Sequence, residues 1–495
     1  MASIEELREA RIKKLGLLKE AGMDPYPPFV LRDYSIKELK SKFNELEKGS
    51  QNKSISIAGR VMIVRGQGAI LFIVLQDGSD KFQAVLKKDS LDENLFNLFV
   101  NTVDNGDIIS VSGSLFVTQR GEQSILIKDW RMGTKALLPL PDKWHGLQDQ
   151  EEIYRKRYLD MIMDENTFNR FIIKSKIIKF IKEFFDKKGF VEIETPILEN
   201  QAGGAMAKVF NTHLSDYDMD MVLRISLEIA HKMVMAGGYE KVYEIGKAFR
   251  NEGSDPTHMQ EFTLMEWYAA YETLETNMAW TEELLKDIAS SLLGKNDFIV
   301  YNNEGVGVSV DFSKEWSRVT FGELLKKDAG IDITTITEEE ARLEALKWGV
   351  DEKEASKLGR GNLLDKIYKK SSRHKIINPT FVTDFPGDLK PLAQQNENGT
   401  AKACQLVIAG AEITNQYAEL VDPIKQRELL VEQSKAKEKG DEETMDVDER
   451  FLMAMEHGMP PMTGFGMGID RLVAIFTEKK NLRDTVFFPL MKPKE

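Results

Sequence analysis

Two arginines, Arg250 and Arg471, stand in segments whose residue types suit nucleotide binding. Arg250 lies in FRNEG (residues 249–253), and the following run HMQEFTLMEWY (258–268) returns as a strand-like segment that carries Phe262. The planar guanidinium of arginine can bind a phosphate or a carboxylate through two parallel hydrogen bonds. Because the sequence contains no P-loop, we expect arginines to bind any phosphate.

The segment around the second arginine, MTGFGMGIDRLVAIF (462–476), places glycine at every second position. On a strand, Gly464, Gly466 and Gly468 would leave one face without side chains, so that a flat ring could approach the backbone closely. Arg471 would then follow at the start of an amphipathic helix. A GxGxG pattern is a weak signal alone, and it gains weight here from the hairpin that contains Arg250.

Strand alternation predicts which side chains of the hairpin face a ligand. The residues that share one face are Phe262, Leu264, Glu266 and Tyr268. A glutamate in such an apolar strand is costly to bury without a partner, so we expect Glu266 to face a ligand or a cation. The alternative is a structural ion pair.

A further run, LVIAGAEITNQYAELVDP (406–423), adds acidic and hydrogen-bonding groups. Alternation predicts Glu412, Thr414 and Gln416 on one face and Asn415, Tyr417 and Glu419 on the other. The latter face, with Glu228, Glu266 and Tyr268, would form an anionic pocket. A substrate with two amino groups fits such a pocket, because each charge-assisted hydrogen bond contributes about 1.5–3 kcal/mol.

Composition limits the class of protein. A net charge of −13 argues against a protein that coats nucleic acid by bulk electrostatics, so any RNA contact must use a local surface. A single cysteine, Cys404, allows no disulfide within the chain and no cysteine metal cluster, which suits the reducing cytosol.

No apolar run approaches the roughly 20 residues of a membrane helix. The first residues read as a helix with a capping box, Ser3 and Glu6, and we expect a cytoplasmic enzyme with no membrane partner.

The pattern along the chain predicts three sections. Residues 1–45 form an N-terminal helical segment, and 46–148 contain five short strand patterns typical of an OB barrel. The third section, 149–495, alternates between helix and strand signals, with an insertion at about 274–380 that reads as mainly helical.

The order of the motifs resembles the class II aminoacyl-tRNA synthetases. GFVEIETPIL (189–198) is similar to their motif 1, the Arg250 hairpin to motif 2, and the Arg471 segment to motif 3, while the class I signatures HIGH and KMSKS are absent. The resemblance implies an α+β fold: a five-stranded OB barrel, then a catalytic domain built on an antiparallel sheet flanked by helices. It also implies a homodimer formed through motif 1.

Within this class the chain most closely resembles the lysyl-tRNA synthetases, from about residue 4 to 493. The resemblance implies ATP and L-lysine as substrates, tRNA(Lys) as partner, Mg2+ as cofactor, and catalysis by Arg250 and Arg471. Residues implied to bind lysine are Gly204, Glu228, Arg250, Glu266, Tyr268, Asn415, Tyr417 and Glu419. Residues implied to bind ATP are Arg250, Glu252, His258, Phe262, Glu412 and Arg471, with adenine between Phe262 and Arg471.

The barrel is implied to read the anticodon through Arg65, Phe72, Gln83 and Glu122. An exposed Phe72 would offer a stacking surface worth about 1–3 kcal/mol per base. From the pattern AILFIVL alone, Phe72 could equally belong to the barrel core.

The chain departs from the family pattern at three positions. Gln405 stands where the family has a magnesium-binding glutamate, seven residues before Glu412, which is itself implied as a metal ligand. Magnesium favours carboxylates, so we expect weaker or fewer bound ions. Gln394 replaces a basic residue, and Met259 an asparagine close to adenine.

Two other functions stay open from the sequence. An aspartyl- or asparaginyl-tRNA synthetase would share the barrel and the hairpin, but it would need basic groups where this chain has Glu228 and Glu419. A catalytically impaired or regulatory RNA-binding protein of the same fold is the second alternative, and Gln405 is the feature that supports it.

Overall fold

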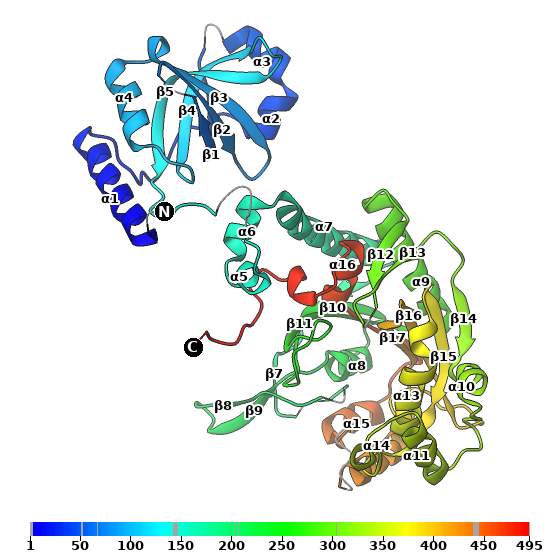
Figure 1. Cartoon of the computed structure of the whole chain (residues 1–495). Coiled ribbons are helices and arrows are strands. Elements are labelled where there is room, and N and C mark those ends of the chain that lie inside the picture. The colour runs from blue at the N-terminus through cyan, green and yellow to red at the C-terminus, as the bar shows by residue number, and fades with distance from the viewer. Residues whose placement is uncertain are drawn as a thin grey trace. The chain divides into compact units, whose positions relative to one another are not determined.

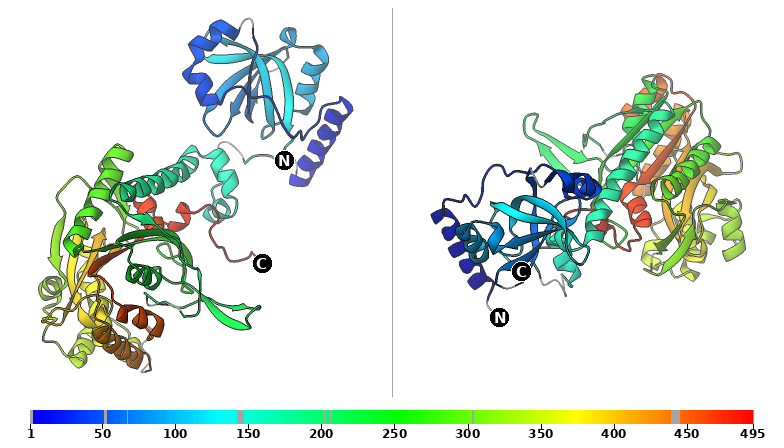
Figure 2. Two further views of the ribbon diagram at one scale, coloured as in Figure 1. Left: turned by 180° about the vertical axis from the view of Figure 1, so that it is seen from behind. Right: turned by 90° about the horizontal axis from the view of Figure 1, so that it is seen from above.

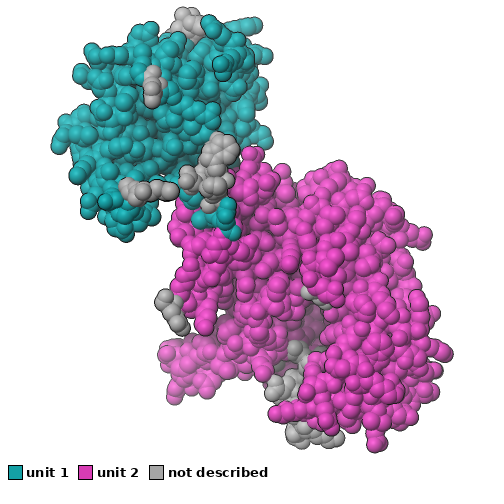
Figure 3. Space-filling model, viewed as in Figure 1, with its two compact units in different colours: residues 1–148 teal, residues 149–495 magenta. Residues whose placement is uncertain are grey.

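The chain divides into two compact units, residues 1–148 and 149–495 (Figure 3). The structure, a computed structural model, describes residues 3–50, 53–66, 68–141, 147–201, 203–205, 207–302, 304–438 and 445–494. Each unit is built around its own hydrophobic core.

The first unit contains a closed five-stranded barrel, which confirms the predicted barrel (Figure 1). Its strands pair in the order β1-β2-β3-β5-β4. Their bounds are β1 Ile55–Arg65, β2 Ile70–Gln76, β3 Lys81–Lys87, β4 Ile108–Val117 and β5 Gln123–Thr134. Alternate residues of β2, such as Leu71, Ile73 and Leu75, fill the barrel core and leave the intervening side chains on the outer surface.

Helices precede the barrel and interrupt it. The predicted capping box of Ser3 and Glu6 opens the first helix, and Ser35 with Glu38 opens the second in the same way. These elements are α1 Ile4–Glu20, α2 Ile36–Ser41, α3 Phe43–Ser50 and, between β3 and β4, α4 Glu93–Thr102.

The second unit is organised on an eight-stranded sheet, in the order β14-β15-β16-β17-β18-β11-β10-β6 (Figures 1 and 2). Neighbouring strands from β15 to β10 are antiparallel, as expected, and the two edge pairs are parallel. The bounds are β6 Val191–Glu192, β10 Lys241–Phe249, β11 Glu261–Ala270, β14 Ser317–Thr320, β15 Thr380–Pro386, β16 Thr400–Ile408, β17 Ala411–Ala418 and β18 Met462–Gly468.

One face of this sheet is covered by apolar helix surfaces. Helix α7 (Glu165–Lys187) buries Ile181 and Phe185 against Trp267 of β11, and α16 (Ile469–Phe476) adds Leu472 to the same cluster. Stacked indole and phenyl rings of Trp267 and Phe465 tie β11 to β18. The other face carries the candidate site described below.

The remaining elements surround the sheet. The α-helices are α5 Gln150–Arg155, α6 Arg157–Met163, α8 Glu228–Ala236, α9 Leu274–Asp287, α10 Phe321–Ala329, α11 Glu338–Lys347, α12 Glu352–Ala355, α13 Arg360–Ser371, α14 Pro423–Glu438 and α15 Glu449–Glu456. The smaller strands are β7 Leu198–Glu199, β8 Asn211–Leu214, β9 Met219–Leu223, β12 Asp297–Tyr301 and β13 Gly307–Asp311. No helix among the described residues is long and apolar enough to span a bilayer.

Two segments differ from the sequence prediction. The stretch 274–380 is not wholly helical, because the alternating residues of β12 and β13 form a hairpin and β14 joins the edge of the main sheet. The predicted strand 190–198 is reduced to the two-residue strands β6 and β7, on either side of Pro196, which lacks the N–H that a continuous ladder needs.

Candidate active site

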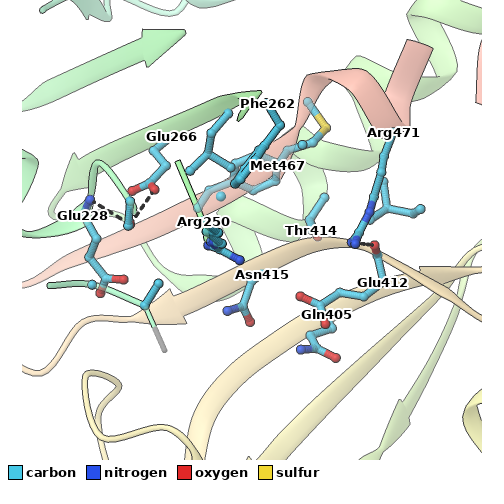
Figure 4. Close-up of a pocket in the computed structure, with 18 of the residues that line it drawn as sticks. Glu228, Arg250, Phe262, Glu266, Gln405, Glu412, Thr414, Asn415, Met467 and Arg471 are labelled. Atoms are coloured by element: carbon cyan, nitrogen blue, oxygen red, sulfur yellow. Dashed lines mark hydrogen bonds between the residues drawn. The ribbon is translucent and has the colours of Figure 1, made fainter. Parts of the chain in front are cut away.

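A cavity of about 610 Å3 opens on the sheet face opposite α7. Every residue that the resemblance assigned to lysine, ATP or metal lines this cavity, from Gly204 to Arg471. The four predicted anticodon residues lie in the other unit. Acidic groups Glu228 and Glu266 occupy one end of the cavity, and Glu412, Gln405 and Arg471 occupy the other (Figure 4).

The register of the sheet sets one row of residues across the cavity floor. Gln405 of β16 lies opposite Asn415 of β17, Asn415 lies opposite Gly466 of β18, and Gly466 lies opposite Glu266 of β11. Side chains of directly paired residues point to the same face of a sheet. The predicted alternation of β11 is confirmed, since Phe262, Leu264, Glu266 and Tyr268 all line the cavity.

Strand β17 departs from simple alternation, so the expectation that Glu412 and Asn415 face opposite sides is wrong. Thr414 pairs with Leu406, whereas Glu412 pairs with Val407, so β17 holds one extra residue between them. Such a β-bulge turns the following side chains to the other face. As a result Glu412 lines the same cavity as Asn415, Tyr417 and Glu419.

The glycines of β18 differ in what surrounds them. A Cβ on Gly464 would collide with Glu419 Oε1 and lie 2.5 Å from Cε1 of Tyr268. A Cβ on Gly466 would meet only Glu266 Cγ at 3.8 Å and the Asn415 carbonyl oxygen at 3.9 Å, and one on Gly468 would touch only Arg471 at 3.9 Å. Gly464 is therefore required by the protein's own packing, while Gly466 and Gly468 leave space open to the cavity.

The carboxylate of Glu266 is held in place by three donors. Ser226 Oγ at 2.9 Å and the backbone N–H of Leu227 at 3.0 Å donate to Oε1, and the Tyr268 hydroxyl donates to Oε2 at 3.2 Å. Burial raises the pKa of Glu266, although Leu227 and Ser226 oppose this by stabilising its charged form. No cationic side chain donates to Glu266 in the described hydrogen bonds, so the structural ion pair considered above is not what fixes it.

A lysine that the sequence analysis missed lies between the other two carboxylates. The fully buried ammonium of Lys232 is 2.7 Å from Glu228 Oε1 and 2.6 Å from Glu419 Oε2. Burial alone would lower the pKa of Lys232, but the two carboxylates outweigh it and raise the pKa above its ordinary value. The expectation that all three carboxylates are left for a ligand is therefore corrected: Lys232 offsets one of their three negative charges.

The spacing of Glu228 and Lys232 could have revealed this pair. The two residues are four apart on α8, the separation at which helix side chains meet. Other cavity residues had no sequence signal: Asn362, Asp365 and Lys369 come from α13, and Lys390 follows β15.

Arg471 lies at the same end as Glu412, and Arg250 lies between the two ends (Figure 4). The Arg250 guanidinium stacks over the ring of Phe262, 5.2 Å from its centroid, and Nε donates to the Ile225 carbonyl oxygen at 3.3 Å. Arg471 donates from Nη1 to the Glu412 carbonyl oxygen at 2.9 Å and lies 3.3 Å from His258 Nε2. Burial lowers the pKa of both guanidinium groups, yet their ordinary value is so high that both stay charged.

His258 and Glu252 border the cavity nearer to solvent. The His258 ring is held by Asp255 at 2.8 Å from Nδ1, and Glu252 lies close enough to oppose, through its charge, the lowering of the Arg250 pKa. His258 thus lies beside the Arg471 guanidinium, and Glu252 lies near that of Arg250.

The cavity offers few ligands to a divalent cation. Glu412 provides one carboxylate, Gln405 provides a neutral amide, and Asp365 is paired with Lys369 at 2.5 Å. No group of three or more metal-binding side chains occurs among the described residues. This donor set fits one Mg2+ that arrives with the phosphates of ATP, but not several ions held by the protein.

Comparison with known proteins agrees with this geometry. Residues 149–492 match the family described as "tRNA synthetases class II (D, K and N)", and residues 55–132 match "OB-fold nucleic acid binding domain". The chain is a class II aminoacyl-tRNA synthetase with an N-terminal OB domain.

Curated relatives show to which family within this class the chain belongs. The chain is 40% identical to the lysine–tRNA ligase of Thermosipho africanus over 494 residues, which cover 99% of this chain and 97% of the relative. It is 40% identical to that of Campylobacter jejuni subsp. doylei (98% and 97% covered) and 39% identical to that of Carboxydothermus hydrogenoformans (99% of both). The chain therefore belongs to the lysine–tRNA ligase family, and these relatives do not favour the aspartyl, asparaginyl or regulatory alternatives.

The two classes of glycine on β18 give a matched pair of substitutions. Gly466→Ala should change the free energy of unfolding by less than about 1 kcal/mol, since the methyl meets no atom closer than 3.8 Å. It should nevertheless reduce ATP binding by about tenfold or more, because the methyl projects into the cavity. Gly464→Ala should instead destabilise the fold by about 1–3 kcal/mol. Urea unfolding and calorimetric titration with ATP measure both effects, and a Gly466→Ala variant with unchanged affinity would contradict the role given to this glycine.

Proposed function

We propose that this enzyme activates L-lysine with ATP to lysyl-adenylate and transfers the lysyl group to the 3′ end of tRNA(Lys). The observation that supports it is the arrangement of charges in the cavity: Glu228 and Glu266 lie at one end, Arg471 lies at the other with Glu412, and Arg250 lies between them (Figure 4). The ribosome uses the aminoacylated tRNA that this reaction produces, so we also propose that the enzyme works in the cytoplasm.

Charge balance favours a dibasic amino acid. When ionised, Glu228, Glu266 and Glu419 carry three negative charges, and Lys232 offsets one of them. Burial raises the pKa of Glu266 and raises that of Glu419 to about 8, so cationic groups of a ligand would favour the ionised forms. Two positive charges, those of the α-amino and ε-amino groups of lysine, would balance the remainder. A neutral or acidic side chain would leave a buried carboxylate without a partner.

Each end of lysine then has its own partners. We assign the α-amino group to Glu228 and Gly204, and the carboxylate to Arg250. The ε-amino group is assigned to Glu266, Tyr268 and Glu419, with Asn415 and Tyr417 along the side chain. Because Ser226 and Leu227 already fix Glu266, its second oxygen is oriented before lysine arrives.

We assign ATP to the opposite end. Adenine lies between Phe262 and Arg471, Glu252 faces the amino edge of the base, and His258 faces the outer phosphates. A lysine carboxylate oxygen attacks the α-phosphorus in line, a P–O bond forms, and pyrophosphate leaves with the electron pair of the bond that breaks. Arg250 and Arg471 position the reactants and stabilise the developing charge. Mg2+ bound with ATP at Glu412 would shield the phosphate charges.

The exchange of pyrophosphate into ATP, measured with each amino acid in turn, tests this proposal. We expect exchange with lysine, and a loss of about 10- to 100-fold in kcat/KM for lysine in Glu266→Gln, since one charge-assisted hydrogen bond is lost. Glu261→Gln, on the exposed end of the same strand and paired only with Lys247 among the described ion pairs, is the control. Exchange with aspartate, or none with any amino acid, would refute the proposed substrate.

We propose that the barrel binds the anticodon. Phe72 is 41% exposed, which excludes the alternative that it belongs to the core. Arg65 lies opposite Phe72, and Gln83 lies opposite Val74, two residues further along β2, so all three share the outer face. Gln83 donates to Ser124 Oγ at 2.8 Å, which orients its amide, and Glu122 is exposed in the turn before β5.

Phe72→Ala should raise the KM for tRNA(Lys) in aminoacylation by about 5- to 100-fold, because the variant loses the stacking energy of one base. Pyrophosphate exchange does not need tRNA and should stay unchanged. Val117→Ala removes an equally exposed apolar side chain from β4 and serves as the control. An unchanged KM for tRNA in the Phe72 variant would remove the barrel surface from the proposal.

We propose a homodimer formed through the motif 1 region. Exposed apolar side chains occur on β6 and β7 of this region and on the preceding helix: Val191 of β6 is 46% exposed, Leu198 of β7 is 46% exposed and Ile172 of α7 is 43% exposed, and β6 is an edge strand of the main sheet. A short edge strand with apolar side chains on its surface favours pairing with a second copy.

Sedimentation equilibrium at micromolar concentration should give twice the chain mass. Leu198→Arg should shift the distribution toward the monomer, whereas Leu343→Arg, an equally exposed site on α11, should not. A monomeric wild-type enzyme that still catalyses exchange would refute the dimer and leave the proposed chemistry intact.

A further inference from the structure

The cavity holds two protein ammonium groups that the proposed chemistry has not used. Lys390 and Lys369 both line the cavity together with Glu412 and Gln405. They come from different elements, since Lys390 follows the short 3-10 helix Gly387–Leu389 and Lys369 belongs to α13.

Lys390 is placed over the cavity floor. Its side chain is buried, and Nζ donates to Asn415 Oδ1 at 3.2 Å, so it lies beside Gln405, the residue opposite Asn415 in the sheet. The ammonium also lies over the rings of Phe385 and Tyr417, at 5.2 and 5.5 Å from their centroids. These contacts fix a positive charge next to the position where a carboxylate ligand is missing.

The charges around Lys390 show where an anion would be attracted. Burial lowers the pKa of Lys390, while Glu412, Asp365 and Glu228 oppose this and Lys369 adds to it. Lys369 is held at 2.5 Å from Asp365, one turn earlier on α13, and its side chain is 39% exposed. A polyphosphate that enters the cavity here would meet two ammonium groups in addition to the two arginines.

The same groups disfavour divalent cations. Lys369 pairs with the Asp365 carboxylate at 2.5 Å, which leaves Glu412 and the neutral amide of Gln405 beside Lys390, whereas a hard cation such as Mg2+ favours carboxylate oxygens. Lysine binds phosphate as a point charge and needs no metal between.

We propose that Lys390 and Lys369 supply part of the positive charge that divalent cations would otherwise bring to the phosphates of ATP, so that the enzyme binds ATP in the absence of metal. This inference rests on the proposed function only for the identity of the nucleotide. It makes Lys390 and Lys369 substrate-binding residues and explains Gln405: a carboxylate at that position would add a ligand for a divalent cation and would compete with the phosphates for Lys390.

The first test is calorimetric titration of the full chain with ATP in EDTA and, separately, in saturating Mg2+. The wild-type enzyme should bind ATP in EDTA with an affinity within about tenfold of that in Mg2+. Lys390→Met and Lys369→Met should each weaken binding in EDTA by about tenfold or more, the loss of one charge-assisted contact. Their affinities in Mg2+ should fall less.

The matched control is Lys370→Met, which removes a lysine next to Lys369 that donates to the Gly349 carbonyl oxygen and does not line the cavity. Its affinity for ATP in EDTA should equal that of the wild type. Wild-type enzyme that binds no ATP in EDTA, or Lys369→Met with unchanged affinity there, would overturn the inference. Because Lys369 is partly exposed, this second variant should fold even if Lys390→Met does not.

The second test counts metal ions by electron paramagnetic resonance of Mn2+ in the presence of ATP. Gln405→Glu should bind more Mn2+ per chain than the wild type and should bind ATP less tightly in EDTA. An equal Mn2+ count would overturn the inference. Lysine-dependent exchange by the wild type in saturating Mg2+ keeps the two proposals apart: its loss refutes the function, whereas its presence with strict metal dependence of ATP binding refutes only this inference.

Discussion

The buried ion triad of Glu228, Lys232 and Glu419 is the interaction on which the rest of the site depends. Two carboxylates that are taken out of water repel each other, and both resist ionisation unless a cation lies between them. Lys232 fills that place from α8, at 2.7 and 2.6 Å. Lys232 opposes the effect of burial, yet the pKa of Glu419 is still raised to about 8 and that of Glu266 is also raised. The wall is therefore fully ionised only when further cationic groups, such as the amino groups of a substrate, join Lys232.

The central sheet connects this acidic wall with the other end of the cavity. Glycine at 466 keeps the centre of the row from Gln405 to Glu266 open, and the bulge of β17 brings Glu412 to the cavity although alternation alone would turn it away. Arg250, the residue that follows β10, lies between the two ends of the cavity (Figure 4). The positions of the residues on β11, β16, β17 and β18 thus follow from strand register, which is rigid, while Arg250 is placed by the first residue after a strand.

Sequence reasoning reached the barrel, the central sheet and every residue that the resemblance placed in the cavity, because these depend on local periodicity and on motif spacing. It failed where the outcome depends on partners distant in sequence. The Lys232–Glu419 contact joins residues 187 positions apart, Lys390 reaches Asn415 across a strand and a turn, and α13 contributes Asp365 and Lys369 from a stretch that read only as an outer helix. The β12–β13 hairpin was missed because its two five-residue strands alternate only briefly beside the longer helical patterns of this stretch.

The two ends of the cavity differ in how much change they tolerate. At the acidic end each carboxylate is buried and bonded to fixed donors, so replacing one member would leave an unpaired charge out of water, which costs about 3–5 kcal/mol. At the nucleotide end Glu412 is partly exposed, Lys369 is 39% exposed and water can screen their charges. A change at Glu412 or Lys369 therefore costs little stability, whereas Gln405 and Lys390, which are 6% and 8% exposed, are enclosed like the acidic wall. The acidic end is accordingly the part of the site that the fold constrains most, and the partly exposed groups of the nucleotide end are the part in which a substitution is best tolerated.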